Sequence, residues 1–384
     1  MLLHGVDMTT TTINLALQGG GSHGAFTWGV LDALLEDGRL AFEGISGASA
    51  GAMNAVALAS GWATARRSKR DPRESARECL SNFWDEVVTL GAAGSVHRKL
   101  FSSLWAGPLG AWGFLSPQPV SPYQFNPLDL NPLRTVLERR IDFEAIRRDS
   151  SHRVYVSATQ VSTGRAAIFQ GRALTADAVM ASACLPQLFQ ASVIDGEAYW
   201  DGGFSANPAL TPLVTHSHSR DVLIVQINPL TRPDIPKSNS EILDRMTELA
   251  FNASLLTQVR LAHAFNRLVD VGAPLADGRG PMRLHRVEGW RALQDLSPSS
   301  RTNADPALIQ RLFHAGREAA AAWLDKRFGA IGVRSTIDVE KEYGDDTWLK
   351  VAPPRRPIVR RLPGASTVRR RVPPAGVHKR HRRR

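Results

Sequence analysis

Residues 13–51 of the chain read INLALQGGGSHGAFTWGVLDALLEDGRLAFEGISGASAG, and this stretch decides the fold. It begins with a short apolar run, passes through a cluster of glycines, and continues as a helical pattern that stops at Gly38. A second apolar run over 42–46 leads into the glycine-framed turn 47–51, and a helix of small residues is expected over 52–59. Strand, loop, helix, strand, turn and helix in this order predict a parallel sheet covered by helices on both faces.

The rest of the chain continues this pattern with one long interruption. Residues 66–90 have helical spacing, whereas 91–130 is rich in Gly, Pro and Trp and shows no sustained period, so we expect a lid or binding loop there. The continuous apolar run 221–228 is typical of a central strand buried on both faces. The other predicted elements are strands over 154–159, 166–169 and 282–287, a hairpin over 193–200, and helices over 174–184, 239–270 and 305–328.

Charge divides the chain into a folded body and a basic tail. The 384 residues carry a formal net charge of +11, but residues 351–384 hold 12 Lys and Arg and no Asp or Glu, so the body carries −1. We therefore expect a disordered tail, and no basic face for specific nucleic-acid binding on the body. The predicted organisation is an N-terminal extension over 1–12, a catalytic domain over 13–212, an α/β part of the same folded unit over 213–350, and the tail over 351–384.

Cysteine content and the terminal sequence bear on the compartment. Cys79 and Cys184 are the only cysteines, so no disulfide framework is expected and a reducing compartment is the simplest expectation. Residues 1–12 lack the basic and apolar regions of a secretory signal, and no uncharged apolar run reaches the roughly 18 residues of a transmembrane helix. These features predict a cytoplasmic protein.

The turn Gly47-Ala48-Ser49-Ala50-Gly51 fits a nucleophile elbow. A Gly-x-Ser-x-Gly turn between a strand and a helix lifts the serine hydroxyl clear of the sheet, and side chains at the two glycine positions would collide with neighbouring backbone. The helix that follows directs partial positive charge at the site. Ser49 is therefore the predicted nucleophile, and the competing interpretation is a serine that only caps the helix.

The glycine loop Gly19-Gly20-Gly21-Ser22-His23-Gly24 allows three interpretations. A dinucleotide-binding loop needs an acid at the end of the second strand, but Glu43 comes earlier and the elbow occupies the place of the ribose. A Walker loop fails because no Gly-Lys-Ser/Thr sequence follows. As an oxyanion hole, consecutive glycines direct backbone N–H groups at a developing alkoxide. The elbow that follows favours the oxyanion hole.

A serine nucleophile needs a proton acceptor, and the chain offers two kinds. A Ser–His–Asp arrangement is formally possible, but no histidine lies in a loop suited to catalysis. Asp201 follows an aromatic strand and precedes Gly202 and Gly203, and burial would raise the pKa of its carboxyl toward neutrality, as a base requires. The histidines considered are His216, His218, His263, His285 and His314, while His23 is expected to cap the following helix or line the pocket.

Glycine loop, early elbow and late Asp-Gly-Gly, in this order, resemble the patatin-like phospholipase family over residues 13–212. The segments Ala181–Pro186 and Asn207-Pro208 also fit this family. The resemblance implies a three-layer α/β/α sandwich with a mostly parallel central sheet, and hydrolysis of lipid acyl esters through an acyl-enzyme without metal or cofactor. It implies Ser49 as nucleophile and Asp201 as its partner in a dyad, Gly19, Gly20, Gly21 and Gly24 as the oxyanion loop, and Gly47, Gly51, Gly202 and Gly203 as supports of the two motifs. Many family members carry Arg after the triple glycine, where this chain has His23.

Other hypotheses remain open beside this resemblance. The chain fits a conventional Ser–His–Asp carboxylesterase or thioesterase, or a non-catalytic regulatory protein of the membrane surface. The aromatic, uncharged loop 101–115 suits an interfacial lid, although a loop packed on the core explains it equally well. The tail 351–384 suits peripheral contact with an anionic inner-membrane surface, at about 1 kcal/mol per basic residue, but a solvated tail or incidental nucleic-acid contact fits as well. The sequence does not indicate an oligomeric state.

Overall fold

A mixed sheet of eight strands forms the centre of the computed structural model, which describes residues 10–105, 121–272, 280–294, 296, 300–301 and 303–344. The strand order is β5-β6-β3-β2-β1-β7-β8, and β4 pairs with β3. The five central strands run parallel, β4 and β6 pair antiparallel with β3, and β5 pairs antiparallel with β6. The strands are β1 (Thr11–Leu17), β2 (Leu40–Ala48), β3 (Arg153–Gln160), β4 (Ala166–Phe169), β5 (Ser192–Ile194), β6 (Glu197–Asp201), β7 (Asp221–Gln226) and β8 (Arg283–Glu288).

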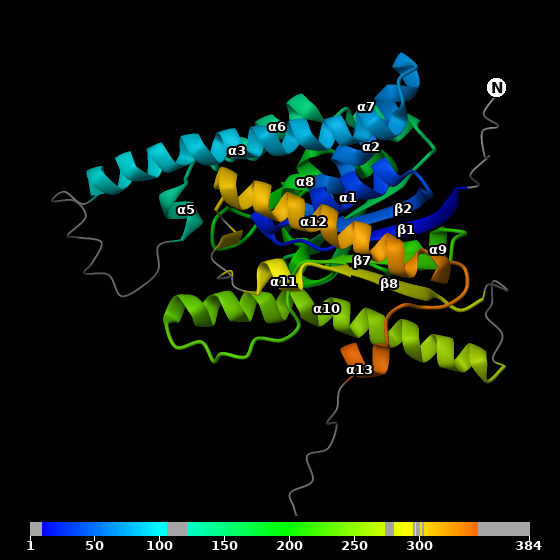
Figure 1. Ribbon diagram of the computed structural model, residues 1–384. Coiled ribbons are helices and arrows are strands. Elements are labelled where there is room, and N and C mark those ends of the chain that lie inside the picture. Colours follow the sequence, from blue (N-terminus) through cyan, green and yellow to red (C-terminus); the bar gives the residue numbers. More distant parts are fainter. Residues whose placement is uncertain are drawn as a thin grey trace, which may run out of the picture. The chain divides into compact units, whose positions relative to one another are not determined.

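Successive residues of the central strands enter opposite cores, because side chains alternate along a strand. In β1, Leu15 and Leu17 join the core under α1 (Gly24–Asp37) and α12 (Pro306–Arg327), whereas Ala16 joins the core under α10 (Asn239–Asp270). Figure 1 shows these helices on the two sides of the sheet. The predicted three-layer α/β/α sandwich, with a mostly parallel central sheet, is confirmed.

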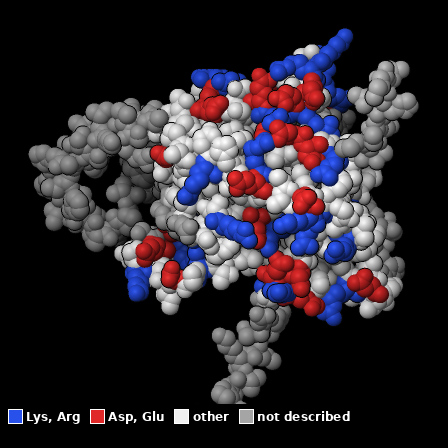
Figure 2. All heavy atoms as spheres, in the orientation of Figure 1, with Lys and Arg blue, Asp and Glu red and all other residues white. Residues whose placement is uncertain are grey.

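Ion pairs fix the helices of the first layer to one another. Arg317 of α12 bonds Asp32 and Glu36 of α1, and Arg77 of α3 (Pro72–Trp105) bonds the same two carboxylates. Figure 2 shows Lys and Arg interspersed with Asp and Glu over the face in view, as such pairing requires. α1 ends where the sequence predicted, because Gly38 adopts a left-handed φ of 76° and its N–H bonds the Leu34 carbonyl.

The second layer is built mainly by α10. Its start agrees with the prediction, because Ser238 and Glu241 form a capping box around the first turn. The short α9 (Thr211–His216) and α13 (Val339–Tyr343) join the same core, and α11 (Trp290–Leu293) lies nearby in Figure 1. All described residues belong to one compact unit that ends at Gly344. The predicted domain boundaries within the chain remain predictions, and the tail 351–384 lies outside the described residues.

The predicted helix over 66–90 and loop over 91–130 are wrong in their bounds. α2 (Ala50–Ser68) runs well beyond 52–59, and α3 continues from Pro72 to Trp105. The break between them comes from the left-handed Lys69 and from Pro72 at the first position of α3. Gly91 does not end α3 but allows close packing, since a Cβ there would come within 2.5 Å of Ala304. The predicted interfacial loop 101–115 is helical up to Trp105, and its remaining residues lie outside the described part.

The other predicted elements agree with the structure to within a few residues, including the β5–β6 hairpin and α8 (Ala176–Ser182). Three short helices between 121 and 150 had no sequence prediction, because each is too brief to show a period: α5 (Pro122–Phe125), α6 (Pro132–Arg140) and α7 (Phe143–Arg148). Within the described ranges, every helix is too short or too polar to span a bilayer.

Candidate active site

Ser49 lies on a strained turn between β2 and α2. Its backbone has φ 52° and ψ −124°, a conformation rare for a residue with a side chain and typical of functional positions. The neighbouring glycines are required by space: a Cβ on Gly47 would lie 2.5 Å from the Gly51 carbonyl, and one on Gly51 would lie 2.2 Å from the Leu17 oxygen. The Ser49 N–H donates to the Ser182 hydroxyl at 2.8 Å, which holds the turn against α8. The local geometry is that of a nucleophile elbow.

Strand register brings Asp201 to the same edge of the sheet as Ser49. Ala48 pairs with Ser157 of β3, and the next residue of β3, Ala158, pairs with Asp201 of β6. Ser49 and Asp201 therefore lie level with each other on either side of β3. The turn after Asp201 is tight, because a Cβ on Gly202 would lie 2.0 Å from the Ser157 oxygen.

The Asp201 carboxyl is fully buried, and burial raises its pKa to about 7. Its Oδ1 accepts a hydrogen bond from the Gly203 N–H at 2.7 Å, and this bond and the neighbouring Ser49 hydroxyl lower the pKa in part. Its Oδ2 has no partner of full hydrogen-bond geometry among the described residues. The contact with Ser49 is therefore loose, as catalytic hydrogen bonds often are without substrate. A carboxyl that titrates near neutrality can take a proton from serine.

Only part of the glycine loop has free N–H groups. The Gly19 N–H donates to the Asn207 side chain at 2.6 Å, and the Gly24 N–H bonds carbonyls of the preceding turn. Among the described residues, no hydrogen bond uses the N–H groups of Gly20 and Gly21. Gly19 and Gly24 allow the loop to approach the elbow closely because they have no side chain. A Cβ on Gly19 would lie 2.8 Å from the Ser49 Cβ, and a Cβ on Gly24 would lie 2.6 Å from the Ala50 Cβ.

Buried amide side chains, which sequence analysis missed, hold this loop in place. Asn228 donates to the Gly19 carbonyl at 2.7 Å, opposite the bond that Asn207 accepts from the Gly19 N–H. Gln18 accepts from the backbone N–H groups of Ile227 and Asn228, which fixes the end of β7 beside the loop. A buried amide needs such partners. The only signal in the sequence was the position of Gln18 directly before the triple glycine.

An apolar cavity of 590 Å³ opens beside Ser49. One wall comes from α3, whose Phe83 and Trp84 belong to the hydrophobic core. The opposite walls come from the start of α6 around Leu133 and from the segment after α8, with Leu185 and Phe189. A cavity lined in this way accepts a hydrocarbon chain whose end lies at the serine hydroxyl.

Among the described residues, Arg301 is the single charged side chain that lines this cavity. It is 10% exposed, and its Nε has no partner among the described residues. Three arginines surround the one buried carboxylate of Glu248: Arg232 at 3.1 Å, Arg245 at 2.6 Å and Arg301 at 3.3 Å. The wall of the cavity near the glycine loop is therefore electropositive.

The described histidine side chains do not bond Ser49 or Asp201. Burial, and the positive charges of Arg301, Arg232 and Arg311, lower the pKa of His23 to about 3, and its ring bonds the Ser300 hydroxyl at 2.7 Å. His23 occupies the N-cap position of α1, but its side chain makes no capping bond, and it is not among the described residues that line the cavity. The other candidates bond elsewhere: His216 to Thr215, His218 to Glu43, His263 to Glu340 and His285 to Asp221, and His314 packs on Phe313.

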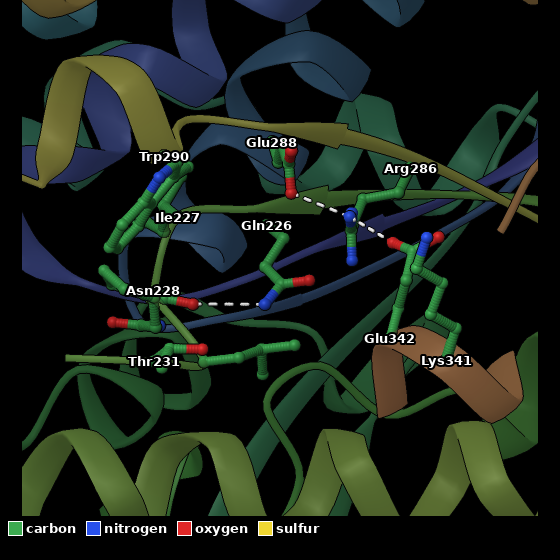
Figure 3. A pocket seen from close by; sticks show the side chains of 11 residues that line it. Gln226, Ile227, Asn228, Thr231, Arg286, Glu288, Trp290, Lys341 and Glu342 are labelled. Atoms are coloured by element: carbon green, nitrogen blue, oxygen red, sulfur yellow. Dashed lines mark hydrogen bonds and ion pairs between the residues drawn. The ribbon is translucent and has the colours of Figure 1, made fainter. Parts of the chain in front are cut away.

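A second cavity, of 330 Å³, lies at the ends of β7 and β8 (Figure 3). Three of its four charged side chains pair with one another, since Arg286 bonds both Glu288 and Glu342. Figure 3 shows Gln226 reaching the backbone of Asn228, whose own side chain supports Gly19. Among the described residues, no serine or cysteine lines it, and no cluster of His, Cys, Asp and Glu is suited to a metal ion. The cavity beside Ser49 is therefore the candidate active site.

The comparison with family models bears on this geometry. The model of the patatin-like phospholipase family matches residues 15–214, which hold the glycine loop, the elbow and Asp201. The chain belongs to the patatin-like phospholipase family. A solved structure with a similar arrangement, VipD from Legionella pneumophila, is 14% identical, with a TM-score of 0.38, and the match covers 82% of this chain and 66% of that one. The chain thus spans slightly less than two thirds of that structure. A comparison with curated protein sequences found no match.

Proposed function

We propose that the protein is a lipid acyl hydrolase that cleaves carboxylic esters with a dyad of Ser49 and Asp201. The observation that carries the proposal is the pairing of a serine on a strained elbow with a fully buried carboxyl whose pKa is about 7. The family to which the chain belongs supports a lipid substrate, and so does the apolar cavity beside Ser49.

The reaction proceeds in two halves. Asp201 accepts the Ser49 proton while Oγ attacks the ester carbonyl, and the N–H groups of Gly20 and Gly21 stabilise the oxyanion. Collapse breaks the bond to the alcohol, which leaves with the proton from Asp201. Water then gives a proton to Asp201 and attacks the acyl-enzyme. The proton returns to Ser49, and the fatty acid leaves.

The dyad is favoured over a Ser–His–Asp triad by the positions of the histidines. The five candidates named from the sequence bond or pack on other groups, and His23 is held neutral by burial. Contact with an anionic membrane through the tail 351–384 and loop 101–115 remains a prediction, because most of these segments lie outside the described residues. A cytoplasmic location also remains a prediction.

A fluorophosphonate probe tests the nucleophile. The wild type should be labelled and should hydrolyse long-chain p-nitrophenyl esters, whereas Ser49→Ala should show neither, and Asp201→Asn should lose at least about 100-fold in turnover. His23→Asn serves as the matched control and should keep its labelling. Equal labelling of wild type and Ser49→Ala would refute the proposal, and loss of activity on replacing one histidine in a folded protein would favour the triad.

A further inference from the structure

The outer face of α10 carries an apolar strip whose central line is interrupted only by Thr257. From residue 242 to residue 266 the described charged side chains of the helix are buried or only partly exposed. The buried residues of the helix, including Phe251, Leu255 and Val259, lie on the opposite side against the sheet. Monomeric proteins rarely expose an apolar patch larger than a few hundred Å², so a strip of this length marks an interaction surface. The large side chains in it are Leu243, Met246, Leu249, Leu261, Phe265, Leu268 and Val271, all more than half exposed.

The spacing of the strip is that of a helix that pairs with another helix. Its central line repeats every 3.5 residues from Leu243 to Val271, which is the period of coiled-coil seams rather than of a straight helix. The positions on this line are Leu243, Met246, Ala250, Ala253, Thr257, Leu261, Ala264, Leu268 and Val271.

The strip is also complementary to itself when reversed. Suppose that two copies of α10 cross antiparallel with their Thr257 residues opposed. All remaining positions on the line then meet an apolar partner of the second copy. Large residues then meet at both ends, and small residues meet toward the centre, where two helix backbones can approach closely. The pairs are Leu243 with Val271, Met246 with Leu268, Ala250 with Ala264, and Ala253 with Leu261. A two-fold interface requires this self-complementarity.

We propose that α10 is the interface of a homodimer in which two copies of the chain pair antiparallel about Thr257. The strip is about 42 Å long at 1.5 Å per residue. Pairing two such strips buries on the order of 1,200 Å² in total, the lower bound of specific interfaces.

A lipid surface suits the strip less well than a second copy. Helices that lie in a membrane interface carry Lys and Arg on their polar face. Outside the core the charges of α10 instead balance, with Glu241, Asp244 and Asp270 against Arg245, Arg260 and Arg267, so no basic excess faces a membrane.

Sedimentation equilibrium of the full chain tests the proposal. The wild type should sediment at twice 41.9 kDa at micromolar concentration. Met246→Glu and Leu268→Lys should each raise the dimer dissociation constant at least 100-fold, because each places a charge opposite an apolar side chain. Val193→Glu changes a residue that is 66% exposed on β5, outside the strip, and should leave the dimer intact.

Mixing the two monomeric variants tests the register. In the proposed pairing Glu at 246 of one copy meets Lys at 268 of the other, so an equal mixture of Met246→Glu and Leu268→Lys should recover the dimer. Leu243→Lys mixed with Met246→Glu should not, since these positions do not face each other. Fluorophosphonate labelling of each variant confirms that it is folded.

Three results would overturn the proposal. The first is a wild type that remains monomeric at about 100 μM, and the second is a dimer that tolerates Met246→Glu. The third is a monomer whose binding to neutral or anionic vesicles is lost in the strip variants, which would assign the strip to a lipid surface.

Discussion

Asp201 combines two properties that rarely occur together, full burial and a titration near neutrality. The free carboxyl of an aspartate ionises near pH 3.9, so the protein environment delays ionisation by about three pH units. The cost of desolvating the charge outweighs the stabilising bond from the Gly203 N–H. This balance makes the carboxylate basic enough to accept a proton from serine.

The first prediction concerns the pH dependence of catalysis. Only ionised Asp201 can accept the Ser49 proton, so kcat/KM should rise with pH as one ionisation with a midpoint near 7 and then level off. Initial rates with a soluble p-nitrophenyl ester between pH 5 and 9 measure this. A midpoint near 4 would show that Asp201 is not the base or is not buried in solution.

The second prediction concerns stability. Below about pH 4 the Asp201 carboxyl is protonated in both the folded and the unfolded chain, and its raised pKa has no effect on folding. Between about pH 4 and 7 only the unfolded chain ionises, so this group makes the fold less stable as pH rises, by about 4 kcal/mol in full. Asp201→Asn should therefore gain stability over wild type as pH rises from 4 to 8, by urea unfolding. A difference independent of pH would contradict the pKa.

Single residues at the site were predictable only where backbone conformation restricts the residue type. Ser49 and the elbow glycines form a recognisable pattern because a turn this tight admits few residues. Asn207 and Asn228 were missed as supports of Gly19, because an amide bonded to the backbone of a distant segment leaves no local pattern. Sequence analysis likewise could not predict that the N–H groups of Gly20 and Gly21 have no hydrogen-bond partner among the described residues, because distant segments of the chain determine this.

At the scale of elements, the elbow depends on contact between α2 and β1. A methyl group on Gly51 would lie 2.2 Å from the Leu17 oxygen, and backbone must move to admit it. We expect Gly51→Ala to lose fluorophosphonate labelling and about 1–3 kcal/mol of stability in urea unfolding. Gly329→Ala is the matched control, because a methyl group there meets open space. Equal effects of the two changes would show that the contact does not position Ser49.

Helix boundaries were harder to predict than strands. Strands β3, β4 and β7 follow apolar runs that end at polar residues, whereas α3 crosses a segment rich in glycine that resembled a loop. Gly91 is in this helix because Ala304 packs against it, and that contact joins segments more than 200 residues apart in the chain. A local pattern cannot distinguish such a glycine from one that ends a helix.

At the scale of the whole molecule, the cavity beside Ser49 is assembled from six separate segments of the chain. We expect its volume of 590 Å³ to limit the length of the acyl chain. Leu133→Trp should narrow it and shift the preference of kcat/KM from long toward short p-nitrophenyl esters by at least about tenfold. Val193→Trp, at an exposed site on β5, should leave the preference unchanged. An unchanged chain-length profile in Leu133→Trp would place the acyl chain elsewhere.

The arginines around Glu248 have a consequence for the end of the reaction. In the proposed reaction, ester cleavage turns a neutral ester into a fatty acid anion within the cavity that Arg301 lines, and the Arg301 Nε has no partner among the described residues. Attraction at low dielectric holds such a product more tightly than the ester it came from. Departure of the acid, rather than bond breaking, should then limit turnover, and a carrier that removes free fatty acid should speed the enzyme.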